Sequence, residues 1–189
     1  MNLQDSFKRE LDSSEVYSEA RRIILNNSLG GVWLIGGAVF RNLAYLVHTS
    51  KKPNVDLDFI VEHDKTPHIL PEGWAEGINR FENPKFFNAN KQIDLIPLSN
   101  IYSIISRNLS PTIGNFLSGV PLTMQALVYD VKNEKLIGEK GLDALQRKVV
   151  EVNDLRFAKY AAKKKGKSLR QYIQEKADEL GFLAVFPTT

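Results

Sequence analysis

The stretch Val32-Trp33-Leu34-Ile35-Gly36-Gly37-Ala38 decides the fold. Four apolar residues in a row are typical of a strand buried in a sheet, and the glycine pair after them predicts a sharp turn. Beyond the turn, apolar residues recur at helical spacing and predict a helix with one buried side; they are Val39, Leu43, Leu46 and Val47. We therefore expect a strand that turns directly into a helix, with free backbone N–H groups at the turn.

A second apolar strand carries two acidic residues where a buried strand would have none. It reads Val55-Asp56-Leu57-Asp58-Phe59-Ile60-Val61. Because side chains in a strand alternate between faces, Asp56 and Asp58 are predicted to point the same way, with Cα atoms roughly 6.5–7 Å apart. Charge beside an apolar core is costly unless a partner neutralises it. Two oxygen donors beside a turn with free N–H groups suit Mg²⁺ together with a phosphate group.

A third carboxylate interrupts a later apolar run. Residues 91–97 read Lys-Gln-Ile-Asp-Leu-Ile-Pro, which predicts a short strand with Asp94 at its centre. A core strand would favour valine at this position. Three acids in two apolar strands therefore predict one metal site.

Length and composition exclude several classes of protein. The chain has 189 residues, enough for one sizeable domain or a domain with a small appendage. It contains no cysteine, which excludes disulfides and thiolate chemistry. No apolar run approaches the roughly 20 residues that cross a bilayer, and no signal-peptide pattern is present, so we expect a cytoplasmic protein that does not contact the membrane. The net charge of +3 does not by itself favour a nucleic-acid partner.

Turn residues and apolar spacing predict the remaining elements. A helix is expected from Ser14 to about Asn27, and a turn at Leu29-Gly30-Gly31. Further predictions are strands at 78–81, 85–87, 126–130, 135–137 and 149–152, helices after Ser99 and at 113–117 and 142–147, and a long helix from Asp154 that Gly166 interrupts. The pattern favours an α/β (α+β) fold, with one domain at 1–152 and a helical segment at 153–189.

The acidic and glycine motifs resemble those of the DNA polymerase beta nucleotidyltransferase superfamily. Within it, the best match is the head domain of bacterial tRNA CCA-adding enzymes and poly(A) polymerases. The likeness rests on Gly36-Gly37-Ala38-Val39-Phe40-Arg41, then Asp56-Leu57-Asp58, then Asp94. The segment 121–130 is similar to the stretch that follows the family's paired arginines, and the segments 135–145 and 148–150 are similar to those that close its head domain. The resemblance covers roughly residues 20 to 165.

The resemblance implies a nucleotidyltransferase fold, with a mixed sheet flanked by helices. The activity it implies is Mg²⁺-dependent transfer of a nucleoside monophosphate from ATP or CTP to a hydroxyl acceptor, an RNA 3′ end, with release of pyrophosphate. Asp56 and Asp58 would bind two Mg²⁺ ions, and Asp94 would hold the ion that activates the attacking hydroxyl. Two ions about 3.5–4 Å apart stabilise the attacking and leaving oxygens of such an in-line displacement.

The same resemblance implies that two regions bind the nucleotide. Gly36 and Gly37 would let the backbone approach the triphosphate, which a Cβ would obstruct. Ala38 and Arg41 would add contacts from the start of the helix. The last two members of the nucleotide-binding set, Asp154 and Arg156, lie where the family pairs an acid with an arginine to select the base.

Some positions depart from the family pattern. Gly119-Val120-Pro121 stands where the family has paired arginines, and Asp154 and Arg156 are two residues apart rather than three. We also expect the chain to lack the family's long domains for holding tRNA. Two alternatives therefore stay open: a head-like domain that binds nucleotide or RNA with weak or no turnover, and an enzyme of the same fold that modifies a small molecule or a protein.

A lysine-rich run follows the predicted neck. Its basic residues are interleaved with Tyr160 and Tyr172, a pattern typical both of an RNA track and of a solvated helix face. The residues expected to contact RNA are Lys159, Lys163, Lys164 and Lys167.

Overall fold

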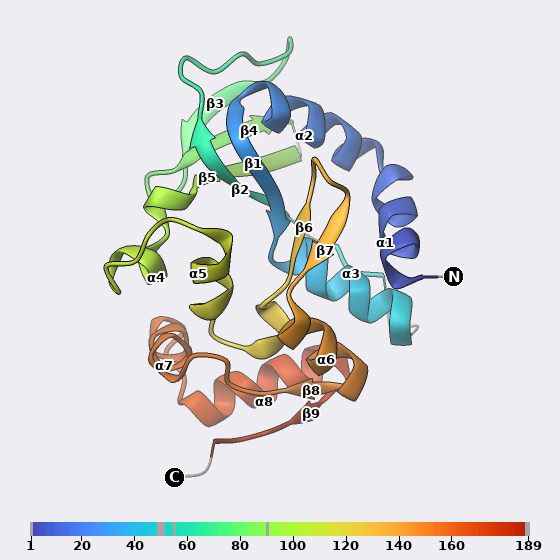
Figure 1. Ribbon diagram of the computed structural model, residues 1–189, viewed down its shortest axis with the longest axis vertical. Helices are drawn as coiled ribbons and strands as arrows, with labels where there is room; N and C mark the ends of the chain where they lie inside the picture. Colours follow the sequence, from blue (N-terminus) through green and yellow to red (C-terminus); the bar gives the residue numbers. More distant parts are fainter. Residues whose placement is uncertain (1, 49–51, 55, 90, 188–189) are drawn as a thin grey trace.

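The computed structural model describes residues 2–48, 52–54, 56–89 and 91–187. At its centre is a seven-stranded sheet in the order β3-β4-β5-β2-β1-β6-β7 (Figure 1). Only β2 and β5 run parallel; all other neighbours are antiparallel. The strands are β1 (Ser28–Ile35), β2 (Leu57–Asp64), β3 (Ala75–Ile78), β4 (Pro84–Asn88), β5 (Lys91–Pro97), β6 (Val128–Asp130) and β7 (Lys135–Ile137).

Helices lie on both faces of this sheet. The N-terminal helices α1 (Leu3–Asp12), α2 (Glu15–Asn26) and α3 (Gly37–His48) pack with one face in the main core. The 3₁₀ turn η1 (Leu98–Asn100) and the short helices α4 (Tyr102–Ile105) and α5 (Ile113–Ser118) cover the other face. The remaining elements lie at one end of the sheet in Figure 1: η2 (Thr123–Gln125), α6 (Glu139–Arg147), β8 (Val149–Val150), α7 (Leu155–Lys164), α8 (Leu169–Leu180) and β9 (Leu183–Ala184).

Strand alternation in β2 decides which residues enter the core. Leu57, Phe59 and Val61 belong to the main core under α1, α2 and α3. Ile60 belongs to the smaller cluster under η1 and α4. Because side chains of a strand alternate, Asp58 lies on the same face as Ile60. The acidic residue therefore faces the side of the sheet that the short helices cover only in part.

The structure confirms several sequence predictions and corrects others. Ser14 caps α2 by accepting a hydrogen bond from the Tyr17 N–H, and β5 spans the predicted residues. The turn predicted at 29–31 is instead part of β1, which begins at Ser28 and contains an irregularity between Leu29 and Val32. The Glu62 carboxylate accepts a hydrogen bond from the Gly31 N–H at this irregularity, which explains why the glycines do not end the strand.

The C-terminal region also differs from the prediction. The strand expected at 149–152 is the two-residue β8, and it is not the last strand, because β9 pairs with it in parallel. Gly166 does interrupt the long helix, which becomes α7 and α8. Ser168 begins α8 with a reciprocal cap: its hydroxyl accepts from the Gln171 N–H, and the Gln171 side chain accepts from the Ser168 N–H.

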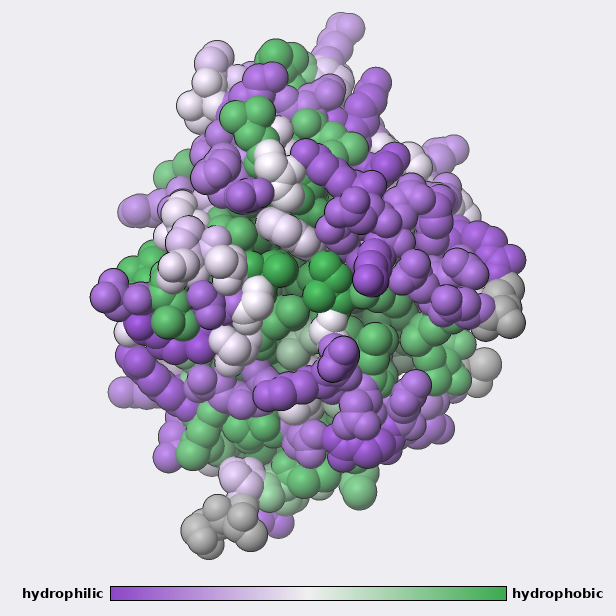
Figure 2. Space-filling view, in the orientation of Figure 1, coloured by the Kyte–Doolittle hydropathy of each residue, from purple (hydrophilic) through white to green (hydrophobic). Residues whose placement is uncertain are grey.

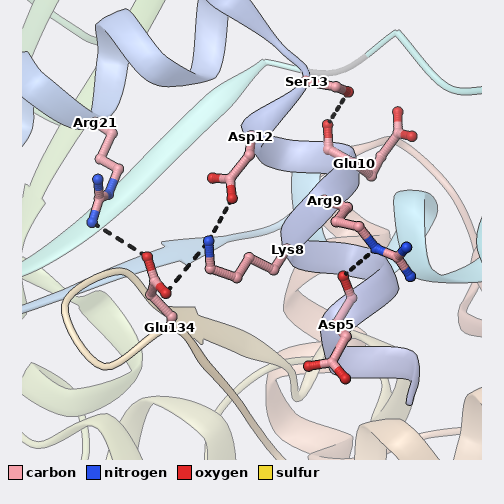
Figure 3. A network of polar contacts seen from close by, with 8 residues as sticks. All are labelled: Asp5, Lys8, Arg9, Glu10, Asp12, Ser13, Arg21 and Glu134. Carbon is pink, nitrogen blue, oxygen red and sulfur yellow. Dashed lines mark hydrogen bonds and ion pairs between the residues drawn. The ribbon is translucent and has the colours of Figure 1, made fainter. Parts of the chain in front are cut away.

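The helix α1 was not predicted from the sequence. Its Phe7 is completely buried and packs edge-on against Tyr129 of β6, with ring centroids 5.4 Å apart. Its Lys8 pairs with Asp12 and with Glu134 of the β6–β7 turn, and Arg21 of α2 lies 3.7 Å from the same Glu134 (Figure 3). Apolar packing and this ion network attach α1 and α2 to the edge hairpin.

None of the helices formed by the described residues is long and apolar enough to cross a membrane.

Replacing Phe7 with alanine is expected to lower the free energy of unfolding by about 3–4 kcal/mol, because it leaves a cavity against Tyr129. The matched control is Val16→Ala in α2, where the side chain is exposed and the change should stay within about 0.5 kcal/mol. Urea unfolding followed by circular dichroism measures both. Equal effects of the two variants would show that α1 does not contribute to the core.

Candidate active site

Asp58 and Asp94 come together through the parallel pairing of β2 and β5. They are direct register partners on these two neighbouring strands. Adjacent strands lie about 4.8 Å apart, and partners in register have side chains on the same face. Two carboxylates therefore stand side by side on the face that carries η1, α4 and α5.

Asp56 lies immediately before β2 rather than within it. The sequence predicted one strand over 55–61, but β2 begins at Leu57, and Val55 lies outside the described residues. The pleat of the strand therefore does not fix the direction of Asp56. Its position is nevertheless close to the other acids, because it lines the same two hollows as Asp58.

The electrostatics of Asp58 show that little compensates its charge. Burial, and after it the neighbouring carboxylates of Asp94 and Asp56, together raise the pKa of Asp58 to about 6, while the charge of Lys85 opposes the shift. The Oδ1 atom of Asp94 is buried and has no hydrogen-bond partner. A buried carboxylate oxygen without a partner is costly, so this cluster is poised to receive a cation or a proton.

The glycine turn lies directly beside these acids. Gly36 has φ +68°, a left-handed conformation that favours glycine, and its carbonyl accepts hydrogen bonds from the N–H groups of Val39 and Phe40. A Cβ at Gly36 would lie 3.3 Å from Oδ2 of Asp58. The Ala38 methyl group is buried in the core, so only its backbone faces the turn. The absence of a side chain at residue 36 therefore keeps the approach to Asp58 open.

Asp56 and Asp58 line two neighbouring hollows. The larger has a volume of about 420 Å³ and is lined by Gly37, Arg41, Asn54, Asp56 and Asp58. The smaller, of about 50 Å³, is lined by Asp56, Leu57, Asp58, Lys85, Gln92 and Asp94. The larger is polar and of a size that suits a small-molecule ligand. The glycine turn, Arg41 and two of the acids therefore line the same hollow.

Arg41 is held by the C-terminal helix α8. Its Nη2 lies 2.5 Å from Oε1 of Glu179, and its buried Nε has no hydrogen-bond partner. Glu179 also pairs with Lys176 of the same helix, whose side chain is largely buried. Arg41 thus lines the larger hollow while an acid from α8 offsets part of its charge.

The remaining predicted residues lie on α7 or at its two ends and are not among those that line the two hollows. The carboxylate of Asp154 caps this helix by accepting from the Phe157 N–H. The guanidinium of Arg156 lies over the Phe157 ring, 5.5 Å from its centroid. Lys159, Lys163 and Lys164 are exposed on α7, and Lys167 just beyond it pairs with Glu175. Their predicted roles in nucleotide or RNA binding stay predictions.

Sequence reasoning did not single out Lys85, Gln92, Asn54 or Glu179. Lys85 lies in β4 directly opposite Asp94, and the pairing of β4 with β5 places it beside the acids. Glu179 contacts Arg41 from α8, near the other end of the chain. No local pattern in the sequence signals either contact, because both depend on elements that meet only in the folded chain.

The carboxylate oxygens of these acids are suitable ligands for a hard cation. Carboxylate oxygens are the ligands that Mg²⁺ favours, and the unpartnered Oδ1 of Asp94 beside Asp58 is an unused donor of this kind. Among the described residues, no three histidine, cysteine or acidic side chains are grouped closely enough to hold a metal ion together. Strand pairing therefore supplies two of the three predicted ligands, and Asp56 is near but not part of a formed cluster.

Comparison with solved structures identifies the fold. The chain is similar to the CCA-adding enzyme of Bacillus stearothermophilus in complex with CTP, with TM-score 0.63 and 17% identity over 91% of this chain and 41% of that chain. A CCA-adding enzyme with ATP gives TM-score 0.61 and 18% identity over 95% and 41%. This chain has a nucleotidyltransferase-type fold.

The Thermotoga maritima CCA-adding enzyme, complexed with tRNA, gives TM-score 0.54 and 18% identity over 93% of this chain and 46% of that chain. The chain thus spans about two fifths of the length of the solved enzymes that it resembles. No family model matches the chain, and no curated protein matches it in sequence. The nucleotidyltransferase-type fold agrees with the expectation from the glycine and acidic motifs.

The raised pKa of Asp58 predicts how stability depends on pH. An unfolded aspartate titrates near 3.9, so between about pH 4 and pH 6 the folded protein keeps a proton that the unfolded chain has lost. The free energy of unfolding should therefore fall as the pH rises through this window, by an amount on the order of 2 kcal/mol, and change little from this cause above it.

Urea unfolding at several pH values, in the presence of a chelator, measures this slope. In Asp58→Asn the fall between pH 4 and pH 6 should be much smaller, because the titrating group is gone. The exposed Asp178→Asn is the matched control and should keep the slope of the parent. An unchanged slope in Asp58→Asn would contradict the assignment.

Proposed function

We propose that this chain is a Mg²⁺-dependent nucleotidyltransferase. It would move a nucleoside monophosphate from ATP or CTP to a hydroxyl acceptor, an RNA 3′ end, and release pyrophosphate. The acceptor oxygen would form a bond to the α-phosphorus while the bond from that phosphorus to the bridging oxygen of pyrophosphate breaks and the hydroxyl proton is released. The observation that supports this most is the pair of uncompensated carboxylates, Asp58 and Asp94, beside the glycine turn.

The acids would have different duties in this reaction. Asp56 and Asp58 would hold two Mg²⁺ ions, with Asp94 as a further ligand on the side of the acceptor hydroxyl. When bound, Mg²⁺ supplies positive charge that polarises the phosphoryl oxygens and lowers the pKa of the attacking hydroxyl. The protein's own contribution is position, since β2 and β5 keep Asp58 and Asp94 in register.

The triphosphate would lie in the larger hollow. Gly37 and the first N–H groups of α3 would face its oxygens, and Gly36 would leave the space that a side chain would fill. Arg41 would add a guanidinium on the same side. These roles are supported by the shared hollow and by the fold likeness to enzymes solved with CTP and ATP.

The division of the chain follows the same proposal. Residues 1–152 would form the catalytic head, and 153–189 would form a neck-like helical segment, with Asp154 and Arg156 at their boundary. Because the chain spans only about two fifths of the solved enzymes, RNA as acceptor is a proposal drawn from their likeness and from the basic residues of α7.

The deciding experiment is incubation with each α-labelled nucleoside triphosphate and Mg²⁺, with and without bulk cellular RNA. Label should appear in RNA with the parent protein and fall at least about 1,000-fold in Asp56→Ala/Asp58→Ala, because positioning and charge stabilisation supply most of the rate. The control Asp178→Asn should retain activity. Label found in a small molecule or a protein instead of RNA would show that RNA is not the acceptor. No transfer to any acceptor would refute the proposal.

The ion pair between Arg41 and Glu179 gives a second test. Glu179 offsets the charge that Arg41 could offer to phosphate, so Glu179→Gln should tighten Mg²⁺–ATP binding, by about threefold for a charge roughly 6 Å away in water. Arg41→Ala should weaken binding by about tenfold, which corresponds to about 1.4 kcal/mol. Calorimetric titration of the parent and both variants with Mg²⁺ and a non-hydrolysable ATP analogue measures these changes. Weaker binding in Glu179→Gln would mean that the acid orients Arg41 rather than competing for it.

A second function, binding of nucleotide or RNA without turnover, is favoured by the small number of arginine charges at the site. Among the described residues, a single arginine, Arg41, lines the larger hollow, and its charge is partly offset by Glu179. Gly119-Val120-Pro121 stands where the family has paired arginines. Nucleotide binding with no transfer in the labelled assay would select this function.

A further inference from the structure

Three exposed aromatic side chains gather where α4, α7 and the β3–β4 turn meet. They are Phe81 in the turn, Tyr102 in α4 and Tyr160 in α7, with 54%, 53% and 46% of their surface exposed. Most aromatic side chains of a folded protein are buried, so three exposed rings from three separate segments form an unusual surface. We refer to these rings and the cations around them as the α7 surface.

Two of these rings already stack. Tyr102 and Tyr160 have ring centroids 5.2 Å apart and planes 29° apart. The buried Phe157 supports the pair from below, edge-on to Tyr102 with centroids 6.2 Å apart. The stack is therefore supported by a core residue while about half of the surface of each tyrosine stays exposed.

Cations lie beside Phe81 and along the helix that carries Tyr160. The Lys164 Nζ is 4.1 Å from the centroid of Phe81, and the Arg80 guanidinium is 4.9 Å from it. Arg156, Tyr160 and Lys164 are spaced four residues apart on α7, so they form one stripe with about 6 Å between neighbours. Cation, aromatic ring and cation thus alternate along a single helix face.

These cations have no acidic partners in the described part of the chain. No carboxylate lies within 4 Å of Arg80, Arg156, Lys159, Lys163 or Lys164 there, in contrast to Lys167, Lys176 and Arg41, each of which is paired. A face that only kept the helix in water would need no exposed aromatic rings among its charges. Exposed cations on and beside α7, together with three exposed rings, are complementary to a polyanion that carries flat apolar groups.

The α7 surface is connected to the acids by β4. This strand leads from the turn that holds Phe81 to Lys85, which lies opposite Asp94. Four residues span at most about 14 Å. Asn83 of the same turn is buried, and its side chain accepts a hydrogen bond from Asn100 of η1, which fixes the turn beside α4. A bound strand on the α7 surface would therefore end near the acids.

We propose that the α7 surface binds the single-stranded 3′ segment of an RNA acceptor. Bases would stack on Tyr102, Tyr160 and Phe81, and the cations of α7 would contact the phosphates. Unpaired bases are required, because bases in a duplex do not expose their faces to an aromatic side chain. The inference rests on the proposed function, in which RNA is the acceptor, and adds the residues that hold it and the form of RNA that they accept.

Fluorescence anisotropy of a labelled 12-nucleotide oligoadenylate with the full chain, in a chelator and without nucleotide, tests binding apart from catalysis. Tyr102→Ala/Tyr160→Ala should weaken binding at least tenfold, because stacking on each ring is lost. Tyr102→Phe/Tyr160→Phe keeps the rings and should bind within about twofold of the parent. Thermal unfolding of each variant confirms that the fold is retained.

The salt dependence tests the charges independently. Arg156→Ala/Lys164→Ala should reduce the slope of log affinity against log salt by about 1.4, since each phosphate contact to a single strand contributes about 0.7. The control is Lys135→Ala, an exposed lysine of β7 at the opposite edge of the sheet, which should leave the slope unchanged.

Three outcomes would overturn the inference: parental binding in Tyr102→Ala/Tyr160→Ala, equal competition by duplex RNA, or equal displacement by polyglutamate. Its failure differs from failure of the proposed function. If only the inference is wrong, Tyr102→Ala/Tyr160→Ala still transfers label to RNA. If the proposed function is wrong, the parent protein binds oligoadenylate but transfers no label.

Discussion

The burial of neighbouring carboxylates at the β2–β5 pair is the constraint on which the site depends. Asp58 and Asp94 are register partners, and burial of Asp58, followed by the charge of Asp94, raises the pKa of Asp58 to about 6. A folded chain tolerates this cost only where the rest of the structure fixes the two strands. The main core does so from the other face, where Phe59, Val61 and Leu95 are fully buried.

The single parallel pair of the sheet explains the shape of the surroundings. Parallel strands need a long connection, and here it contains the β3–β4 hairpin, which returns to pair with β5. This return brings Lys85 opposite Asp94 and carries Phe81 toward α4 and α7. One topological requirement therefore supplies both the cation beside the acids and one ring of the α7 surface.

The C-terminal helices connect the two sides of the site. Glu179 of α8 holds Arg41 at the larger hollow, while α7 carries the stripe of cations and Tyr160. Figure 2 shows a further apolar hollow in the middle of the visible face, lined by Leu117, Ala126, Ile137 and neighbouring residues. It lies between α5, β7 and α6, and none of the three acids lines it.

The sequence by itself determined the strand and glycine turn at 32–38, the strand at 91–97, and the presence of acids where apolar residues belong, because these are local patterns of spacing and hydropathy. It also supported the nucleotidyltransferase-type fold through the order of these motifs. It did not reveal α1, whose Phe7 is anchored by Tyr129 far along the chain. It also read Asp56 as part of β2, which begins one residue later.

Only the tertiary structure decided which acids are neighbours, that Lys85 and Glu179 reach the site, and that three exposed rings from distant segments meet at α7. Strand register, helix docking and the burial that shifts a pKa depend on residues far apart in the chain. No local pattern encodes them, because their energies exist only once the elements have packed.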